Sequence, residues 1–254
     1  MKVSSQTSLL DDFFEAIRFL TIFKLPSRNF LPENALARSM IFFPAAGFLI
    51  GGLSLGIFMI AESFFPLRIA TLILLIAPIF ISGGLHVDGF TDFCDGFFGG
   101  KDKLDVLRIM KDPHVGAWGA LGVALLMLTK FELLQTLPER AYIFLLAVTV
   151  SRWAQALLSF SLPYAGLGGG MSEQVAQKVG LREVLGASLF LIPFLFWSPK
   201  NGFFLLVGFL PFLFLLGLFF KKRVGGLTGD LLGAASELTE VFIFFLATLW
   251  VRYI

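Results

Sequence analysis

Long apolar segments alternate with short polar ones along most of the chain. A helix needs about 20 apolar residues to cross a hydrocarbon core about 30 Å thick, so apolar runs of about this length indicate membrane spans. We expect seven spans, at Ile41–Ala61, Ile69–His86, Gly116–Leu134, Ala141–Leu162, Val184–Trp197, Phe203–Phe220 and Leu227–Val251. The pattern therefore predicts an all-α fold, a polytopic transmembrane helix bundle.

The segment Leu9–Leu25 has a different pattern. Its apolar residues recur near one helix face, and its charged residues, Asp12 among them, fall elsewhere. The segment is too short and too charged to span, so we expect residues 1–40 to form a cytoplasmic interfacial segment before the bundle of residues 41–254.

The composition leaves little material for a separate soluble domain. Of the 254 residues, 57% are hydrophobic, and 32 are phenylalanine. We therefore expect a single integral-membrane domain over residues 1–254. The one cysteine, Cys94, excludes an internal disulfide and a cluster of thiolate metal ligands.

The distribution of basic residues predicts the orientation of the bundle. With the N-terminus inside, only four of the 20 basic residues lie outside: Arg68, Arg140, Lys200 and Arg252. Lys130 and Arg152 lie within spans, and the other fourteen fall in cytoplasmic segments, as the positive-inside rule requires. We found no basic patch interleaved with aromatic residues, so we expect the lipid bilayer and not nucleic acid as a partner.

Three aspartates follow the second predicted span, in the sequence GGLHVDGFTDFCDGFFGG. Asp88, Asp92 and Asp95 are spaced i, i+4 and i+7, which places them within about 60° of each other on a helix. Carboxylates this close near a bilayer repel each other, so a cation would stabilise them. Oxygen ligands suit magnesium, calcium or manganese. The alternative is a solvated acidic helix end, but the flanking residues are glycine and phenylalanine.

A second acidic group begins the last predicted span. Asp230 and Glu237 share a helix face, and Gly233 and Ala234 between them would let another helix pack closely. Both acidic groups lie on the cytoplasmic side in the predicted topology, so they could converge on one site. The alternative, a helix start that complements its own dipole, explains Asp230 but not the deeper Glu237. Glu240 is the weaker candidate.

The segment between the two groups carries candidates for phosphate binding. Lys111 and Arg108 could bind phosphate oxygens or could be ordinary cytoplasmic charges, and Asp112 could serve a metal or phosphate site. His86 and His114 lack a second histidine at ligand spacing, which favours a role in a polar network.

Three further basic residues lie in or beside the spans. We expect Lys130 to extend to the outer interface and Arg152 to pair with a carboxylate of the bundle. Arg38 is interpreted as a topology charge.

Five sequence blocks closely resemble the cobalamin synthase family, the adenosylcobinamide-GDP ribazoletransferases. They are FFEAIRFLTIFKLP, ARSMIFFPAAGFLIG, GGLHVDGFTDFCDGFFGG, RIMKDPHVGAWGALG and GGLTGDLLGAASELTE. The resemblance implies an enzyme that joins α-ribazole or its 5′-phosphate to the corrinoid nucleotide adenosylcobinamide-GDP and releases GMP, at the end of cobalamin biosynthesis. It also implies magnesium, which manganese could replace, and the cytoplasmic (inner) membrane.

The resemblance also suggests roles for the aspartates. By analogy with CDP-alcohol phosphotransferases, metal binding falls to Asp88, Asp92 and Asp95, and the general base would be Asp95 or, second, Asp112. Two alternatives are another phosphotransferase of that kind, which lacks support because Ala-Arg does not follow the first Asp-Gly, and a cation-coupled transporter, which lacks a repeated half. The sequence leaves open whether the chain forms oligomers.

Overall fold

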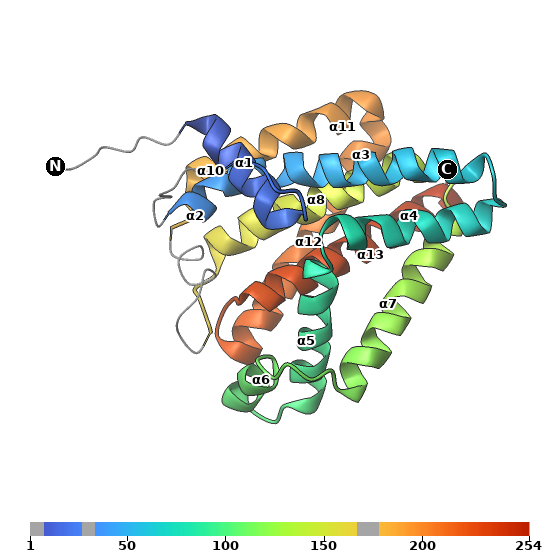
Figure 1. Cartoon of the computed structure of the whole chain (residues 1–254). Helices are drawn as coiled ribbons and strands as arrows, with labels where there is room; N and C mark the ends of the chain where they lie inside the picture. The colour runs from blue at the N-terminus through green and yellow to red at the C-terminus, as the bar shows by residue number, and fades with distance from the viewer. Residues whose placement is uncertain (1–7, 27–33, 167–177, 254) are drawn as a thin grey trace.

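The computed structural model describes residues 8–26, 34–166 and 178–253. Over these residues the chain forms helices and loops, and the one β-bridge joins Tyr164 to Leu227. Figure 1 shows long helices lying side by side, with α5 and α7 extending away from the main group. The predicted all-α helix bundle is confirmed.

Helices and short 3-10 turns follow one another from the N-terminus to the C-terminus. They are α1 (Leu9–Leu20), α2 (Ala35–Ser39), η1 (Met40–Phe42), α3 (Phe43–Glu62), α4 (Leu67–Ile81), α5 (Leu85–Gly99), α6 (Lys103–Ile109), α7 (Ala117–Thr136), α8 (Arg140–Ser161), α10 (Leu181–Ser188), η2 (Leu189–Leu191), α11 (Ile192–Trp197), α12 (Pro199–Val224) and α13 (Gly229–Tyr253).

Fewer helices than predicted are long and apolar enough to cross a membrane. Within the described residues there are five, in the segments Ala35–Glu62, Ala117–Thr136, Arg140–Ser161, Gly202–Val224 and Gly229–Trp250. The pair α4 and α5 makes a sixth if it is counted as one bent span. The chain is thus built as a membrane protein, but the prediction of seven spans is not confirmed.

The predicted fifth span, Val184–Trp197, is not among these helices. It consists of the end of α10, the 3-10 turn η2 and the short α11. A proline, Pro193, lies in the first turn of α11 and has no backbone N–H to donate into the preceding turn. The apolar pattern continues through this point, but Pro193 interrupts the helix there.

The predicted second span, Ile69–His86, ends earlier than expected. Helix α4 stops at Ile81, and α5 departs at an angle of 91°. Gly83 and Gly84 lie between the two helices with φ of 63° and 77°, in the left-handed region that favours glycine. His86 therefore belongs to α5 and shares a helix with the three aspartates.

Helix α8 lies at the centre of the bundle, between α3 and α13 (Figure 1). Its window of membrane-spanning length is 89% buried. Because α8 is surrounded by protein, the polar side chains Ser151, Arg152 and Gln155 on it can be paired inside the bundle rather than exposed to lipid.

The amphipathic N-terminal helix is confirmed as α1, although it ends at Leu20. The prediction that Asp12 lies on its charged face is wrong, because Asp12 is buried and accepts a hydrogen bond of 2.8 Å from Arg38. Burial raises the pKa of Asp12 above its ordinary value. Arg38, interpreted as a topology charge, thus ties α1 to α2.

Candidate functional site

Helices α5 and α13 approach each other backbone to backbone. A Cβ added to Gly89 would lie 2.7 Å from the carbonyl oxygen of Asp230, and one added to Gly233 would lie 3.1 Å from that of His86. Only glycine permits this approach. The close packing predicted for the small-residue face of the last span is therefore confirmed, and it brings the first acidic group beside the start of α13.

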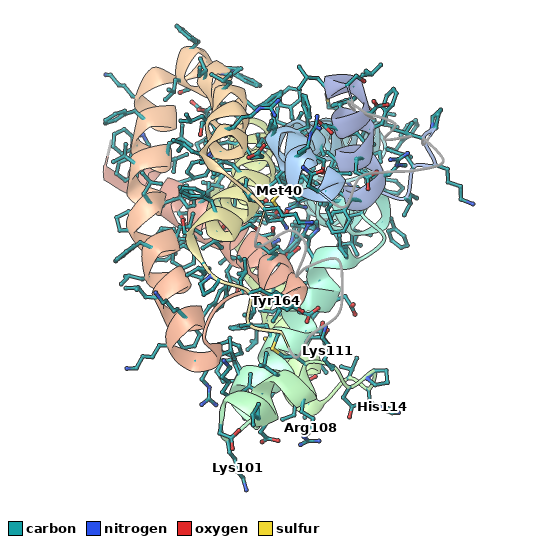
Figure 2. All side chains as sticks on the ribbon, turned by 90° about the vertical axis from the view of Figure 1, so that its left-hand side faces the viewer. Met40, Lys101, Arg108, Lys111, His114 and Tyr164 are labelled. Carbon is teal, nitrogen blue, oxygen red and sulfur yellow. The ribbon has the colours of Figure 1, made fainter. Side chains whose placement is uncertain are left out.

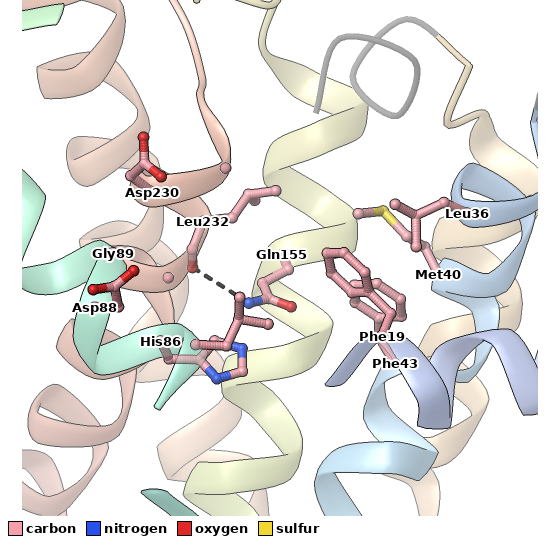
Figure 3. Close-up of a pocket in the computed structure, with 13 residues that line it drawn as sticks. Phe19, Leu36, Met40, Phe43, His86, Asp88, Gly89, Gln155, Asp230 and Leu232 are labelled. Atoms are coloured by element: carbon pink, nitrogen blue, oxygen red, sulfur yellow. Dashed lines mark hydrogen bonds between the residues drawn. The ribbon is translucent and has the colours of Figure 1, made fainter. Parts of the chain in front are cut away.

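A cavity of about 190 Å³ opens at this junction. Asp88 of α5 and Asp230 of α13 both line it, and Figure 3 shows their carboxylates on the same side. The opposite side is formed by apolar side chains, among them Phe19 and Phe43. The predicted convergence of the two acidic groups is thus confirmed for Asp88 and Asp230.

Lys111 joins this group from the segment that follows α6. Its Nζ lies 3.2 Å from Oδ2 of Asp230. Asp92, one turn after Asp88 on α5, interacts electrostatically with Asp230, Asp88, Asp95 and Lys111. Carboxylates therefore outnumber the ammonium group here, which leaves a local excess of negative charge.

Asp95 faces a different partner. Its Oδ2 accepts a hydrogen bond of 2.7 Å from the N–H of Gly116, and its Oδ1 accepts one of 2.8 Å from that of Gly119. The side chain is buried, and it satisfies two backbone donors at the start of α7. Asp95 does not line the cavity that Asp88 and Asp230 share.

Arg108, Asp112 and His114 are exposed, and Figure 2 shows Arg108 and His114 with Lys111 toward one end of the molecule. Arg108 pairs with Asp105 at 2.7 Å. Oδ1 of Asp112 accepts hydrogen bonds from the backbone N–H of His114 at 3.0 Å and from the Nδ1 atom of its ring at 2.7 Å. These hydrogen bonds hold the pKa of Asp112 below its ordinary value. None of these residues lines the cavity.

Glu237 lies two turns deeper along α13 than Asp230, in a buried network of charges. Lys130 of α7 donates hydrogen bonds to Glu237 and, at 2.7 Å, to Glu240. Arg152 of α8 donates to Glu240 at 3.1 Å, which confirms its predicted pairing with a carboxylate. The prediction that Lys130 extends to the interface is wrong, because it is only 4% exposed.

His86 and Gln155 also line the cavity, between its acidic and apolar sides (Figure 3). Within the described residues, neither ring nitrogen of His86 has a hydrogen-bond partner, and neither does Oε1 of Gln155. Nε2 of Gln155 donates to Ser236 at 2.7 Å. Sequence reasoning missed Gln155, although a polar residue one turn after Arg152 inside an apolar span was a usable signal.

Comparison with known proteins identifies the family. The profile of the family described as cobalamin-5-phosphate synthase matches residues 12–248. The adenosylcobinamide-GDP ribazoletransferase of Chlorobaculum parvum is 35% identical over 250 residues, which cover 96% of this chain and 97% of that protein. The protein of the same name from Chlorobium phaeovibrioides is 37% identical and covers 94% and 97%. A third, from Desulforamulus reducens, is 36% identical and covers 92% and 94%.

No solved structure matches the chain. The family match nevertheless includes every residue that lines the cavity, from Phe19 of α1 to Gly233 of α13, and the relatives match over nearly their whole length. The chain belongs to the cobalamin-5-phosphate synthase family.

Proposed function

We propose that this protein is an adenosylcobinamide-GDP ribazoletransferase that acts at the cavity between α5 and α13. The observation that carries the proposal is the meeting of Asp88, Asp92 and Asp230 with Lys111 beside a cavity, in a chain of this family. A ribose hydroxyl of α-ribazole or its 5′-phosphate attacks the phosphate attached to the corrinoid side chain. A new phosphorus–oxygen bond forms to the ribose, the bond to GMP breaks, and the hydroxyl proton passes to a base.

Magnesium suits the donors that are present. The three carboxylates supply only oxygen, and magnesium commonly binds through one or two carboxylates together with phosphate oxygens and water. Within the described residues, no three acidic, histidine or cysteine side chains are placed to hold a metal ion together, so we propose a site with two carboxylate ligands. We assign Asp92 and Asp230 as the ligands. When bound, the ion would neutralise charge on the diphosphate and on the departing GMP.

Lys111 and Asp88 are assigned the remaining roles, which are binding of the diphosphate and acceptance of the hydroxyl proton. The ammonium group of Lys111, 3.2 Å from Asp230, binds diphosphate oxygens beside the ligands. Asp88 lines the cavity and accepts the hydroxyl proton. This assignment replaces the two bases expected from the sequence, because both oxygens of Asp95 accept backbone hydrogen bonds and the lowered pKa of Asp112 makes it a weaker base. Asp95 then positions α7 against α5.

We also propose that the protein lies in the cytoplasmic membrane, with its N-terminus and active site on the cytoplasmic side. The support is the gathering of basic residues at one end of the bundle. Lys101, Lys103, Arg108 and Lys111 lie between α5 and α7, and Lys221, Lys222 and Arg223 end α12, where Arg223 donates to the backbone oxygen of Gly100. Lys111, which pairs with Asp230, belongs to that side.

The test is turnover by the purified protein in detergent, with magnesium, adenosylcobinamide-GDP and α-ribazole. We expect GMP and a corrinoid product in equal amounts, and loss of both when EDTA removes the metal. Asp92→Asn should lower kcat at least about 100-fold, in line with the ~2.7 kcal/mol that one electrostatic contact in a transition state contributes. Asp105→Asn is the matched control, because Asp105 is an acidic residue on α6 that pairs only with surface groups.

Absence of GMP release by the wild-type protein with either magnesium or manganese would overturn the proposed activity. Undiminished turnover in EDTA would overturn the proposed metal requirement but not the proposed activity. Titration with manganese, followed by electron spin resonance, tests the ligands separately, and unchanged affinity in Asp92→Asn would remove that residue from the site.

A further inference from the structure

The side of the cavity away from the carboxylates is an aromatic and apolar wall. The rings of Phe19 and Phe43 stack on each other, with centroids 5.9 Å apart and planes at 18°. Leu36 and Met40 complete this wall, which Figure 3 shows facing Gln155. Such a wall suits the face of an aromatic ring and offers no partner to a charged group.

Two buried polar side chains stand beside this wall, and each has polar atoms without a hydrogen-bond partner. His86 is 2% exposed and Gln155 is 3% exposed. Within the described part of the chain, Nδ1 and Nε2 of His86 and Oε1 of Gln155 make no hydrogen bond. Buried polar atoms in native proteins are nearly always paired, so unpaired atoms on two side chains that line a cavity indicate a ligand that supplies their partners once these side chains turn toward it.

The size of the cavity limits what that ligand can be. Its volume of about 190 Å³ exceeds that of a ~150 Å³ cavity known to hold benzene, but it is far too small for a corrin macrocycle. A bicyclic base fits, and each substrate of the proposed reaction carries one. They are the dimethylbenzimidazole of α-ribazole and the guanine of the corrinoid nucleotide. Guanine presents several amide and amino groups, whereas the wall of Phe19, Leu36, Met40 and Phe43 offers none a partner.

We propose that this side of the cavity, which we name the base pocket, binds the dimethylbenzimidazole of α-ribazole; this inference rests on the proposed function. The base pocket consists of Phe19, Leu36, Met40, Phe43, His86 and Gln155. The ring lies against the aromatic wall, an N–H of His86 donates to the unsubstituted ring nitrogen, and Oε1 of Gln155 accepts from a ribose hydroxyl. The ribose then lies on the side of Asp88 and Asp230, where its other hydroxyl can react.

The first test fills or trims the base pocket and measures KM for each substrate. Leu36→Phe adds a ring to the space for the base, and Phe19→Leu removes half of the stacked pair. Both should raise KM for α-ribazole at least about tenfold, which corresponds to ~1.4 kcal/mol, and should change KM for adenosylcobinamide-GDP by less than about twofold. Phe212→Leu is the control for Phe19→Leu, because Phe212 is also half-buried and stacked, on Phe242 at 4.1 Å, but lies away from the cavity.

The second test examines the hydrogen bond of His86. An α-ribazole analogue in which CH replaces the unsubstituted ring nitrogen should bind the wild-type protein about tenfold more weakly in calorimetry, since it leaves the imidazole N–H unpaired. His86→Phe should bind the analogue and α-ribazole equally. If His86 has a purely structural role, the wild-type protein should bind the analogue as tightly as α-ribazole, and that result would contradict the assignment.

The outcomes separate this inference from the proposed function. If the wild-type protein turns over but neither Leu36→Phe nor Phe19→Leu changes KM for α-ribazole, the base pocket is overturned and the function stands. If these variants instead raise KM for adenosylcobinamide-GDP and weaken binding of GMP, guanine is the occupant and the inference is wrong. If the wild-type protein neither turns over nor binds α-ribazole in calorimetry, both fail.

Discussion

Replacing Lys130 with methionine should strongly destabilise the protein. In the wild-type protein two cations and two carboxylates balance, and Lys130, Glu237, Glu240 and Arg152 are 4%, 6%, 5% and 2% exposed. The methionine fills a similar volume but leaves Glu237 without the ammonium group that it contacts. The two hydrogen bonds lost would cost roughly 1 kcal/mol, because such bonds between membrane helices average ~0.6 kcal/mol each.

The unbalanced charge makes the whole penalty larger than that of the lost hydrogen bonds alone. Removing one partner of a buried ion pair costs about 3–5 kcal/mol, since the remaining charge is desolvated and uncompensated. We therefore expect a loss of about 3 kcal/mol in the free energy of unfolding, the lower end of that range, because Glu237 can escape part of the penalty by taking up a proton. For a chain of this size the melting temperature should fall by about 6–12 °C.

The measurement is thermal unfolding in detergent micelles, followed by the fluorescence of the four tryptophans. The double variant Lys130→Met/Glu237→Gln restores the charge balance and should recover at least half of the loss. Lys101→Met is the control, since Lys101 is exposed, and its effect should stay within about 0.5 kcal/mol. A melting temperature of Lys130→Met within about 2 °C of the wild-type value would refute this reasoning, as would a double variant no more stable than the single one.

Two further predictions concern how α5 is held. Asp95→Asn keeps one acceptor oxygen where the N–H groups of Gly116 and Gly119 need two, so the variant should lose about 1–3 kcal/mol of stability while retaining turnover. Unchanged stability with abolished turnover would instead support Asp95 as a metal ligand. Gly89→Ala adds a Cβ 2.7 Å from a backbone oxygen of α13 and should lower kcat/KM at least about tenfold by separating the carboxylates, at a cost of ~1.4 kcal/mol or more. Gly52→Ala, with nothing within 4 Å of its Cβ, is the matched control, and equal activity of the two variants would contradict the expected separation.

The sequence predicts the helices because their pattern is local. The spans around α3, α7, α8, α12 and α13 each have an apolar run of sufficient length, and their bounds agree with the structure to within several residues. The two failures have a common physical cause. The predicted spans continue through Gly83–Gly84 and Pro193, whereas the backbone bends at the first and resets its hydrogen bonding at the second. A scale that measures only transfer to lipid cannot detect either event.

The carboxylate spacing predicts a shared helix face but not the neighbour that each side chain meets. Asp88 and Asp95 are on one stripe of α5, yet Asp88 lines the cavity and Asp95 accepts hydrogen bonds from α7. The difference depends on where α7 crosses α5, which is set by packing between distant segments. Two glycines at the start of α7, Gly116 and Gly119, leave the space that Asp95 occupies there.

Depth along α13 separates the two carboxylates that the sequence grouped together. Seven residues of helix rise about 10 Å, so Asp230 and Glu237 share a face but not a location. Asp230 meets Lys111 beside the cavity, whereas Glu237 meets Lys130 inside the bundle. The deeper group joins α7, α8 and α13, and these helices in turn position Gln155 and Asp230 at the cavity. The buried charges therefore fix the helices on which the reactive carboxylates stand, and a loss of stability in Lys130→Met should be accompanied by weaker binding of both substrates.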